Sequence, residues 1–141
     1  MEPALLPEDP EDIVKVAVEK AKVQPVLFYG KSTVYKACPS WPDEKGLVSV
    51  ADKLRVNAQM FFDKLQEATS GFYFLEADEE KDLGLMRGVD YRNGKPKGIC
   101  LVLACTFATK SEYLQALGRV RRSTDQGCVY ELQQQMWEQN N

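Results

Sequence analysis

Residues 99–105 are ICLVLAC, the most apolar run of the sequence. A short run that is apolar throughout, without alternation, is typical of a strand buried on both faces of a sheet. Four other short runs share this character. They are QPVLFYG at 24–30, with the strand expected over 25–29, GLVSV at 46–50, FYFLE at 72–76 and CVYEL at 128–132. The sequence therefore predicts a sheet of short buried strands.

Segments with helical spacing of apolar residues lie between these runs. Helices are expected over 9–22, 51–69 and 111–122, and a short helix or turn over 78–86. The first should begin at Asp9 and Pro10, because an acidic start followed by proline is typical of a helix N-terminus. Strands that alternate with helices favour an α/β three-layer sandwich with a mainly parallel sheet. In such a sheet ligands bind beyond the carboxyl ends of the strands, so the loop at 87–91 and the helix after ICLVLAC are the places to expect a site.

Length and composition fit one domain with one core: the chain has 141 residues, of which 44% are hydrophobic. We expect the domain over 10–132, a flexible N-terminal segment over 1–9 and a polar tail over 133–141. The N-terminus has no basic region followed by an apolar stretch, and no apolar run approaches the length of a membrane span. These features predict an intracellular protein of the nucleus or cytoplasm, without a membrane partner.

Charge and residue content narrow the chemistry. The net charge is −3, so any contact with nucleic acid should be local, and weak for the chain alone. The sequence contains no histidine, which removes Ser-His and Cys-His nucleophile arrangements. The four cysteines form no C-x-x-C pair, and we expect no metal site and buried free thiols instead. Chemistry, if present, rests on carboxylates, lysines and arginines.

The stretch YLQALGRVRRSTDQG at 113–127 contains a row of polar residues with helical spacing. At about 100° per residue, one side of the helix is apolar and the opposite side is polar. The apolar side has Tyr113, Leu114, Leu117 and Val120, and the polar side has Gln115, Gly118, Arg119 and Arg122. Two arginines on adjacent turns can bind one polyanion, and guanidinium forks suit phosphate oxygens. The alternative is an ordinary solvated face with cations near a helix C-terminus.

These residues resemble conserved motifs of superfamily 2 helicases and translocases. The pattern Gln-x-x-Gly-Arg-x-x-Arg at 115–122 reproduces motif VI, and Arg-Gly-x-Asp at 87–90 resembles the core of motif V. PVLFY at 25–29 is similar to the motif IV strand that opens the same domain. In this order the motifs cover nearly the whole chain as the second, C-terminal RecA-like domain.

The resemblance implies that Arg119 and Arg122 act as arginine fingers. In that family these arginines reach the β- and γ-phosphates of an ATP molecule bound mainly on the first RecA-like domain, where they stabilise charge on the transferred phosphoryl group. Gln115 would help position the nucleotide or its attacking water. ATP and Mg²⁺ are therefore expected only with a partner, a phosphate-loop-bearing RecA-like domain in cis or in trans.

The resemblance also assigns nucleotide-binding roles to motif V. Asp90 would approach the ribose or couple the cleft to motif VI, and Gly88 would let the backbone pass close to the nucleotide. Arg87 belongs to the same set. The alternatives are a simple turn at Gly88 and Asp90, and a surface salt bridge at Arg87.

Several residues depart from the family pattern. GKST at 30–33 resembles the end of a phosphate loop, but Pro25 stands where the upstream glycine should be. We therefore expect no ATPase activity from the chain alone. Arg121 replaces a usual glycine of motif VI, and Asp82 stands in EKDLGLM, where the family has a threonine that contacts nucleic acid.

Two other functions remain open. The first is a catalytically inert, helicase-derived interaction or scaffold module, which the departures at Arg121 and Asp82 favour. The second is a free-standing flavodoxin-like enzyme or a receiver domain, which would need an acidic cluster at the strand ends. LEADEE at 75–80 is a candidate for such a cluster.

Overall fold

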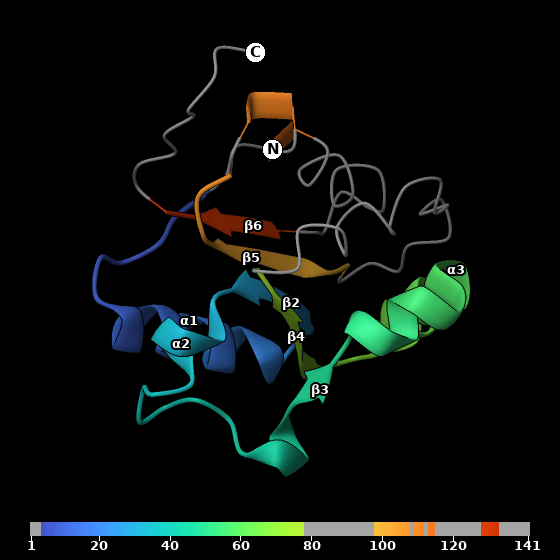
Figure 1. Cartoon of the computed structure of the whole chain (residues 1–141). Helices are drawn as coiled ribbons and strands as arrows, with labels where there is room; N and C mark the ends of the chain where they lie inside the picture. The colour runs from blue at the N-terminus through green and yellow to red at the C-terminus, as the bar shows by residue number, and fades with distance from the viewer. Residues whose placement is uncertain (1–3, 78–97, 108, 112, 115–127, 133–141) are drawn as a thin grey trace.

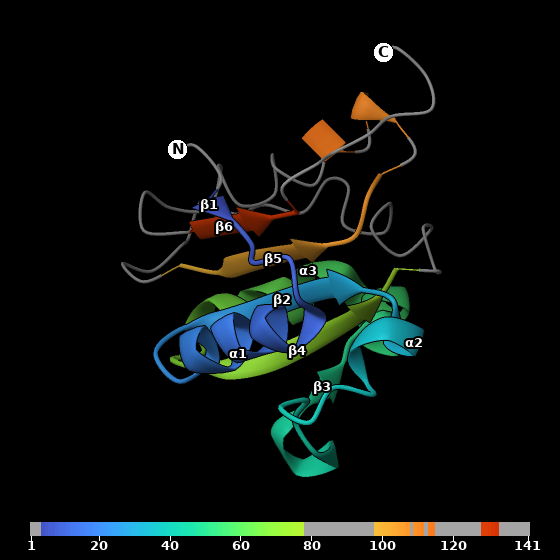
Figure 2. The same ribbon diagram turned by 90° about the vertical axis from the view of Figure 1, so that its left-hand side faces the viewer.

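The computed structural model describes residues 4–77, 98–107, 109–111, 113–114 and 128–132, with the backbone alone at 51–55, 58 and 66. The described strands form one six-stranded sheet in the order β1-β6-β5-β2-β4-β3, and every neighbouring pair is parallel (Figure 2). The strands are β1 (Ala4–Leu5), β2 (Pro25–Gly30), β3 (Val48–Ser49), β4 (Gly71–Glu76), β5 (Cys100–Ala104) and β6 (Cys128–Glu131). The helices are α1 (Pro10–Ala21), α2 (Ser32–Tyr35) and α3 (Ala51–Glu67), with a 3₁₀ turn at Glu44–Gly46. The predicted α/β class and parallel sheet are confirmed.

Helices cover both faces of the sheet (Figure 1). On the face that we call the α1 face, Val26 and Phe28 of β2 pack with apolar residues of α1 and α2. On the opposite face, the α3 face, Leu27 and Tyr29 pack with Phe62 and other residues of α3. Alternate residues of one strand thus enter different cores, which explains why the strands are apolar throughout.

The edge strand β1 was not predicted. Ala4 and Leu5 pair with β6, and the amide of Leu6 donates to the carbonyl oxygen of Glu131 at 2.7 Å. Leu6 is only 1% exposed, so it belongs to the core. Part of the N-terminal segment that was expected to be flexible therefore packs on the sheet. Two residues of strand are too few for periodicity to detect.

The helix α1 begins as predicted, because the side chain of Asp9 accepts a hydrogen bond from the amide of Glu11 and Pro10 occupies the first turn. The helix α3 is interrupted at Asn57, whose backbone is extended (φ −162°, ψ 96°). The side-chain oxygen of Asn57 accepts from the amide of Met60 at 3.0 Å. Asn57 therefore caps the second half of the helix, where the sequence predicts a continuous one.

The connections run in opposite directions on the two faces. The chain advances along the sheet from β1 to β2 and on to β3 over the α1 face. It returns from β3 to β4 over the α3 face, and the segment after β5 packs on that face through Phe107 and Tyr113. Crossovers of one handedness require this reversal. The neighbours β2 and β5 are thus followed by chain on opposite faces, which makes their carboxyl ends a topological switch point.

Candidate functional site at the carboxyl edge of the sheet

The predicted site residues lie outside the described residues. Motif V, with Arg87, Gly88 and Asp90, belongs to the connection from β4 to β5, and motif VI, with Gln115, Arg119 and Arg122, belongs to the connection from β5 to β6. The structure does describe the strand ends from which both connections leave. The strands β4 and β5 are the two neighbours of β2, so motifs V and VI follow strands on either side of the same central strand.

The predicted helix after β5 is confirmed at its start. Residues 110, 111, 113 and 114 are helical, and the amide of Tyr113 donates to the carbonyl oxygen of Thr109 at 3.3 Å. The ring of Tyr113 packs against Phe107, and its hydroxyl donates to the carboxylate of Glu131 at the end of β6. Leu114, which was predicted on the core side, is 49% exposed. The start of this helix is thus anchored through Tyr113.

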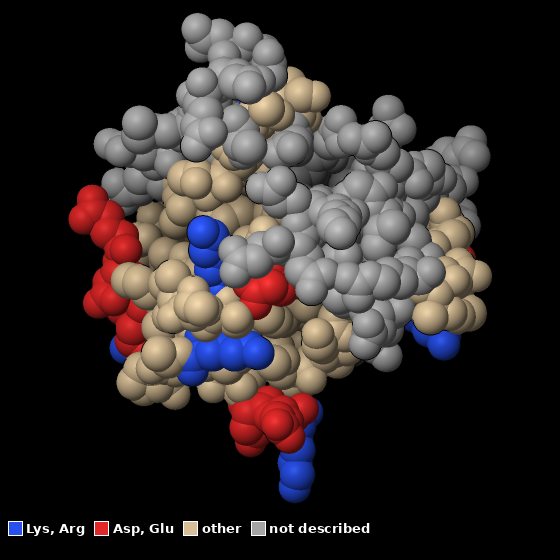
Figure 3. Space-filling model, viewed as in Figure 1, with Lys and Arg blue, Asp and Glu red and all other residues tan. Residues whose placement is uncertain are grey.

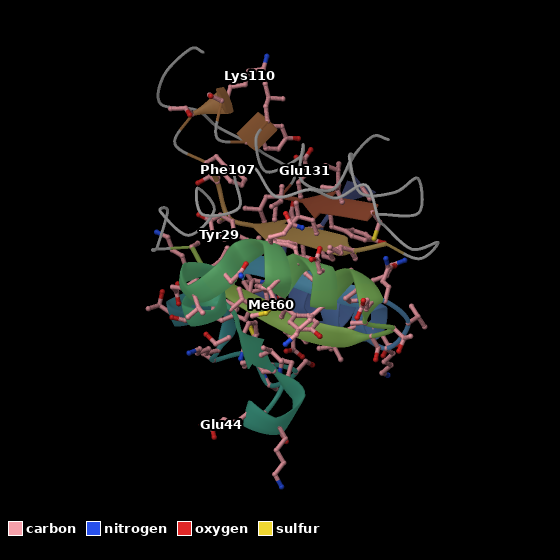
Figure 4. The ribbon with its side chains drawn as sticks, turned by 90° about the vertical axis from the view of Figure 1, so that its right-hand side faces the viewer. Tyr29, Glu44, Met60, Phe107, Lys110 and Glu131 are labelled. Atoms are coloured by element: carbon pink, nitrogen blue, oxygen red, sulfur yellow. The ribbon has the colours of Figure 1, made fainter. Side chains whose placement is uncertain are left out.

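A second tyrosine ties the strand ends together on the α3 face. The hydroxyl of Tyr29, near the end of β2, donates to the carbonyl oxygen of Ala77 at 3.3 Å. Its ring stacks on Phe107, with ring centroids 5.6 Å apart (Figure 4). The residues that follow β4 and β5 are therefore both held against the end of β2.

A third tyrosine, Tyr35, holds a strand end in place on the α1 face. Tyr35 of α2 is 5% exposed, and its hydroxyl donates to the carbonyl oxygen of Ala104, the last residue of β5, at 3.0 Å. Burial raises the pKa of Tyr35 to about 12. The sequence analysis missed this residue, because nothing in KSTVYK indicates which strand the tyrosine will meet. Its ring packs edge-on against Phe28 of β2, so Tyr35 links β2 to the end of β5 across the switch point.

The GKST stretch has a structural role. The amide of Ser32 donates to both carboxylate oxygens of Glu76, at 3.0 and 3.2 Å. A phosphate loop would offer such an amide to a phosphate group, but here the anion is supplied by the end of β4. A Cβ atom on Gly30 would lie 2.9 Å from a ring carbon of Phe28, so the glycine is required by its aromatic neighbours. This geometry agrees with the expectation from Pro25 that the stretch is no phosphate loop.

Charges are sparse at this edge in the described residues. Lys31 and Lys110 are exposed, and Glu76 and Glu131 take part in the contacts described above. On the face seen in Figure 3, the described lysines lie apart from one another. No group of three potential metal ligands occurs among the described residues. No described helix is long and apolar enough to cross a membrane.

Comparisons with known proteins bring no match from a family model, a curated protein or a solved structure. The helicase assignment therefore rests on the motif residues and on where the described fold puts their flanking strands. Strand order is informative about one alternative. Counted from β2, the five strands from β2 to β6 have the order 2-3-1-4-5, whereas a flavodoxin-like sheet has 2-1-3-4-5. The flavodoxin-like alternative loses its support, and Glu76 of its acidic cluster is already bonded to Ser32.

The four cysteines are free thiols. The prediction that they are buried is confirmed for Cys100 and Cys105, whereas Cys38 and Cys128 are half-buried.

Proposed function

We propose that this chain is the C-terminal RecA-like domain of a superfamily 2 helicase-type or translocase-type ATPase. Its role is to supply Arg119 and Arg122 as arginine fingers to an ATP molecule held by a phosphate-loop-bearing domain, in the same polypeptide or in another. The supporting observation is that the two connections with motif sequences leave the carboxyl edge of a parallel sheet on both sides of β2. Ligands of doubly wound sheets bind at that edge.

The described contacts suit such a role, because an arginine finger acts only when it is held in position. The hydroxyls of Tyr29, Tyr35 and Tyr113 tie together the ends of all four strands from β4 to β6 in the sheet. Tyr113 lies on the segment that leads into motif VI, and its ring packs on Phe107, which stacks on Tyr29 of β2. The start of the finger helix is thereby fixed relative to β2.

The nucleotide itself would be held elsewhere. Glu76 occupies the first amide of α2, so a phosphate group there would meet a carboxylate instead of a free donor. Gln115, Arg87, Gly88 and Asp90 would contact the nucleotide from this side of the cleft. The phosphate loop and the carboxylates that bind Mg²⁺ would come from the partner domain.

The first experiment measures ATP hydrolysis by the purified chain. We expect no turnover above the buffer background, because the residues that hold phosphate and Mg²⁺ are supplied by the partner. Turnover that co-elutes with the chain and is unaffected by Arg122→Ala would contradict the proposal, since the catalytic site would then be of another kind.

The decisive experiment uses the complex. Cross-linking and mass spectrometry identify the phosphate-loop protein or domain that binds the chain, and the ATPase rate of the reconstituted complex is compared for four variants. Arg119→Ala and Arg122→Ala should each lower turnover by roughly 10³-fold or more. Arg122→Lys should recover little, because an ammonium group lacks the planar fork.

Lys110→Ala is the matched control, because it removes a positive charge from the exposed start of the same helix. It should leave both turnover and melting temperature unchanged. If both arginine-to-alanine variants keep full activity in a complex that hydrolyses ATP, the row of arginines is not catalytic. The interaction or scaffold module would then replace the present proposal.

A further inference from the structure

Two cysteines face each other at the amino edge of the sheet, at the opposite end of the strands from the proposed ATP cleft. Cys100 is the first residue of β5 and Cys128 is the first residue of β6, and the two are register partners in a parallel pair. The amide of Cys128 donates to the carbonyl oxygen of Ile99 at 3.3 Å, which holds the two strand starts together.

The geometry of this pair permits a disulfide bond. Register partners project to the same side of a sheet, and both cysteines belong to the apolar cluster of the α1 face. Neighbouring strands lie about 4.8 Å apart. A disulfide bond needs Cα atoms about 4.4–6.8 Å apart with converging side chains. The bond would therefore need no rearrangement of the strands.

The two thiols have different surroundings. Cys100 is fully buried, whereas Cys128 is half-buried and hence the one that a small solute can reach. The hydrogen bond between the thiols lowers the pKa of Cys128, and the nearby ammonium group of Lys20 acts in the same direction, although burial opposes both. The same hydrogen bond, together with burial, raises the pKa of Cys100. Cys128 is thus the thiol that ionises first.

Polar groups of α1 and of the chain that follows it complete the cluster. The ammonium group of Lys20 lies over the ring of Tyr130, 5.7 Å from its centroid, on the strand that begins with Cys128. The side-chain oxygen of Gln24 accepts a weak hydrogen bond from the thiol of Cys128 at 3.7 Å.

We propose that Cys128 and Cys100 form an oxidation site for hydroperoxides, with Cys128 as the attacking thiol and Cys100 as the resolving thiol. The thiolate of Cys128 attacks the terminal peroxide oxygen, so that an S–O bond forms, the O–O bond breaks and the alcohol or water leaves with a proton from solvent. Cys100 then attacks the sulfenic acid of Cys128. A disulfide bond forms, the S–O bond breaks and a second water molecule leaves, with the peroxide as the oxidant throughout.

The other two cysteines provide internal comparisons. Burial and the carboxylates of Glu11 and Asp9 raise the pKa of Cys38, so this half-buried thiol should react more slowly than Cys128. Cys105 is buried in the core of the α3 face, on the other side of the sheet. Neither of them is a register partner of another cysteine.

The test maps disulfide bonds in the full chain. Reduced protein is treated with equimolar hydrogen peroxide at neutral pH, free thiols are blocked with N-ethylmaleimide, and the digest is analysed without reduction. We expect a peptide that links Cys100 to Cys128, its loss after dithiothreitol treatment, and blocked thiols at Cys38 and Cys105. A Cys38→Ser/Cys105→Ser double variant should give the same link.

Two further measurements keep the result interpretable. In Cys100→Ser, the sulfenic acid of Cys128 should persist and be trapped by dimedone. The same oxidation in concentrated urea should give mixed pairs, because the register is lost. If folded wild-type protein yields no link between Cys100 and Cys128, or yields the same mixture as the unfolded chain, the proposal is wrong.

Discussion

The hydroxyl of Tyr35 should make the stability of this protein depend on pH in a way that Tyr35→Phe removes. In the folded chain burial raises the pKa of Tyr35 to about 12, against the ordinary value of about 10 that applies after unfolding. Below pH 10 the hydroxyl is protonated in both states and its contribution is constant. Above pH 10 the unfolded chain loses this proton first, so the free energy of unfolding falls as pH rises and levels off above pH 12.

The size of the effect follows from the same two values. Each pKa unit corresponds to about 1.4 kcal/mol. The ionisation of Tyr35 should therefore lower the free energy of unfolding of the wild type, relative to pH 8, by about 1.4 kcal/mol at pH 11 and by at most about 2.7 kcal/mol beyond pH 12. At pH 8 Tyr35→Phe should instead be the less stable protein by about 1 kcal/mol, because it lacks the hydrogen bond to Ala104. The two stability curves should therefore cross between about pH 10 and pH 11.

Urea unfolding at a series of pH values measures this crossing. Trp41 is a suitable fluorescence probe, since its ring makes edge contacts with Phe28, Phe72 and Phe74. The remaining tyrosines are the same in both proteins, so their contributions cancel in the difference. Absorbance at high pH should independently show one late-ionising tyrosine in the wild type that the variant lacks. A constant stability difference from pH 8 to pH 11.5 would refute the account of Tyr35 as a buried donor.

Substitutions at Gly30, Glu76 and Asn57, each with a control variant, test the carboxyl edge and the break in α3 by urea unfolding. Gly30→Ala should lower stability by about 1–3 kcal/mol, because the new methyl group would overlap Phe28, whereas Gly46→Ala, whose nearest neighbour would lie 3.6 Å away, should change it little. Glu76→Ala should lower the free energy of unfolding by about 0.5–2 kcal/mol, because the amide of Ser32 at the start of α2 loses its acceptor. Glu76→Gln should lower it less, because one acceptor oxygen remains. Equal losses of stability in the two variants would contradict this capping role. Asn57→Ala should lower the free energy of unfolding by about 1 kcal/mol, and Asn57→Asp should lower it little, because aspartate also caps helices. An alanine variant as stable as the wild type would show that Asn57 does not cap the helix.

The strands that could be predicted are those with a continuous apolar run. The five runs quoted from the sequence each contain a strand of the sheet, and ICLVLAC lies beside β2 at its centre. The strands in the runs at 24–30 and 99–105, β2 and β5, are buried along their whole length, so local composition already contains the information. β1 was missed because two residues carry no periodicity, and α2 because a four-residue helix is stabilised by contacts instead of by its own sequence.

The candidate site was predictable only in part. The position of its motifs between strands followed from the order of the runs, but the contacts that frame it did not. Tyr29, Tyr35 and Glu76 act through partners that are 48, 69 and 44 residues away in the chain. Such pairs depend on strand order, which no local pattern specifies. The break at Asn57 was a different failure, because asparagine is tolerated inside a helical pattern and also caps helices well.

The two proposals concern opposite ends of β5 and are physically independent. Ala104 ends this strand at the carboxyl edge, and Cys100 begins it about 13 Å away, at about 3.3 Å per residue. Oxidation at Cys100 and Cys128 joins two strand starts that are already paired, so it alters no contact of Tyr29, Tyr35 or Tyr113. The connection that contains Arg119 and Arg122 nevertheless joins the two ends of the sheet, because it begins after Ala104 at the carboxyl edge and ends at Cys128 at the amino edge. A disulfide bond would close that connection into a covalent loop, which restricts the unfolded chain and leaves the folded frame as it is.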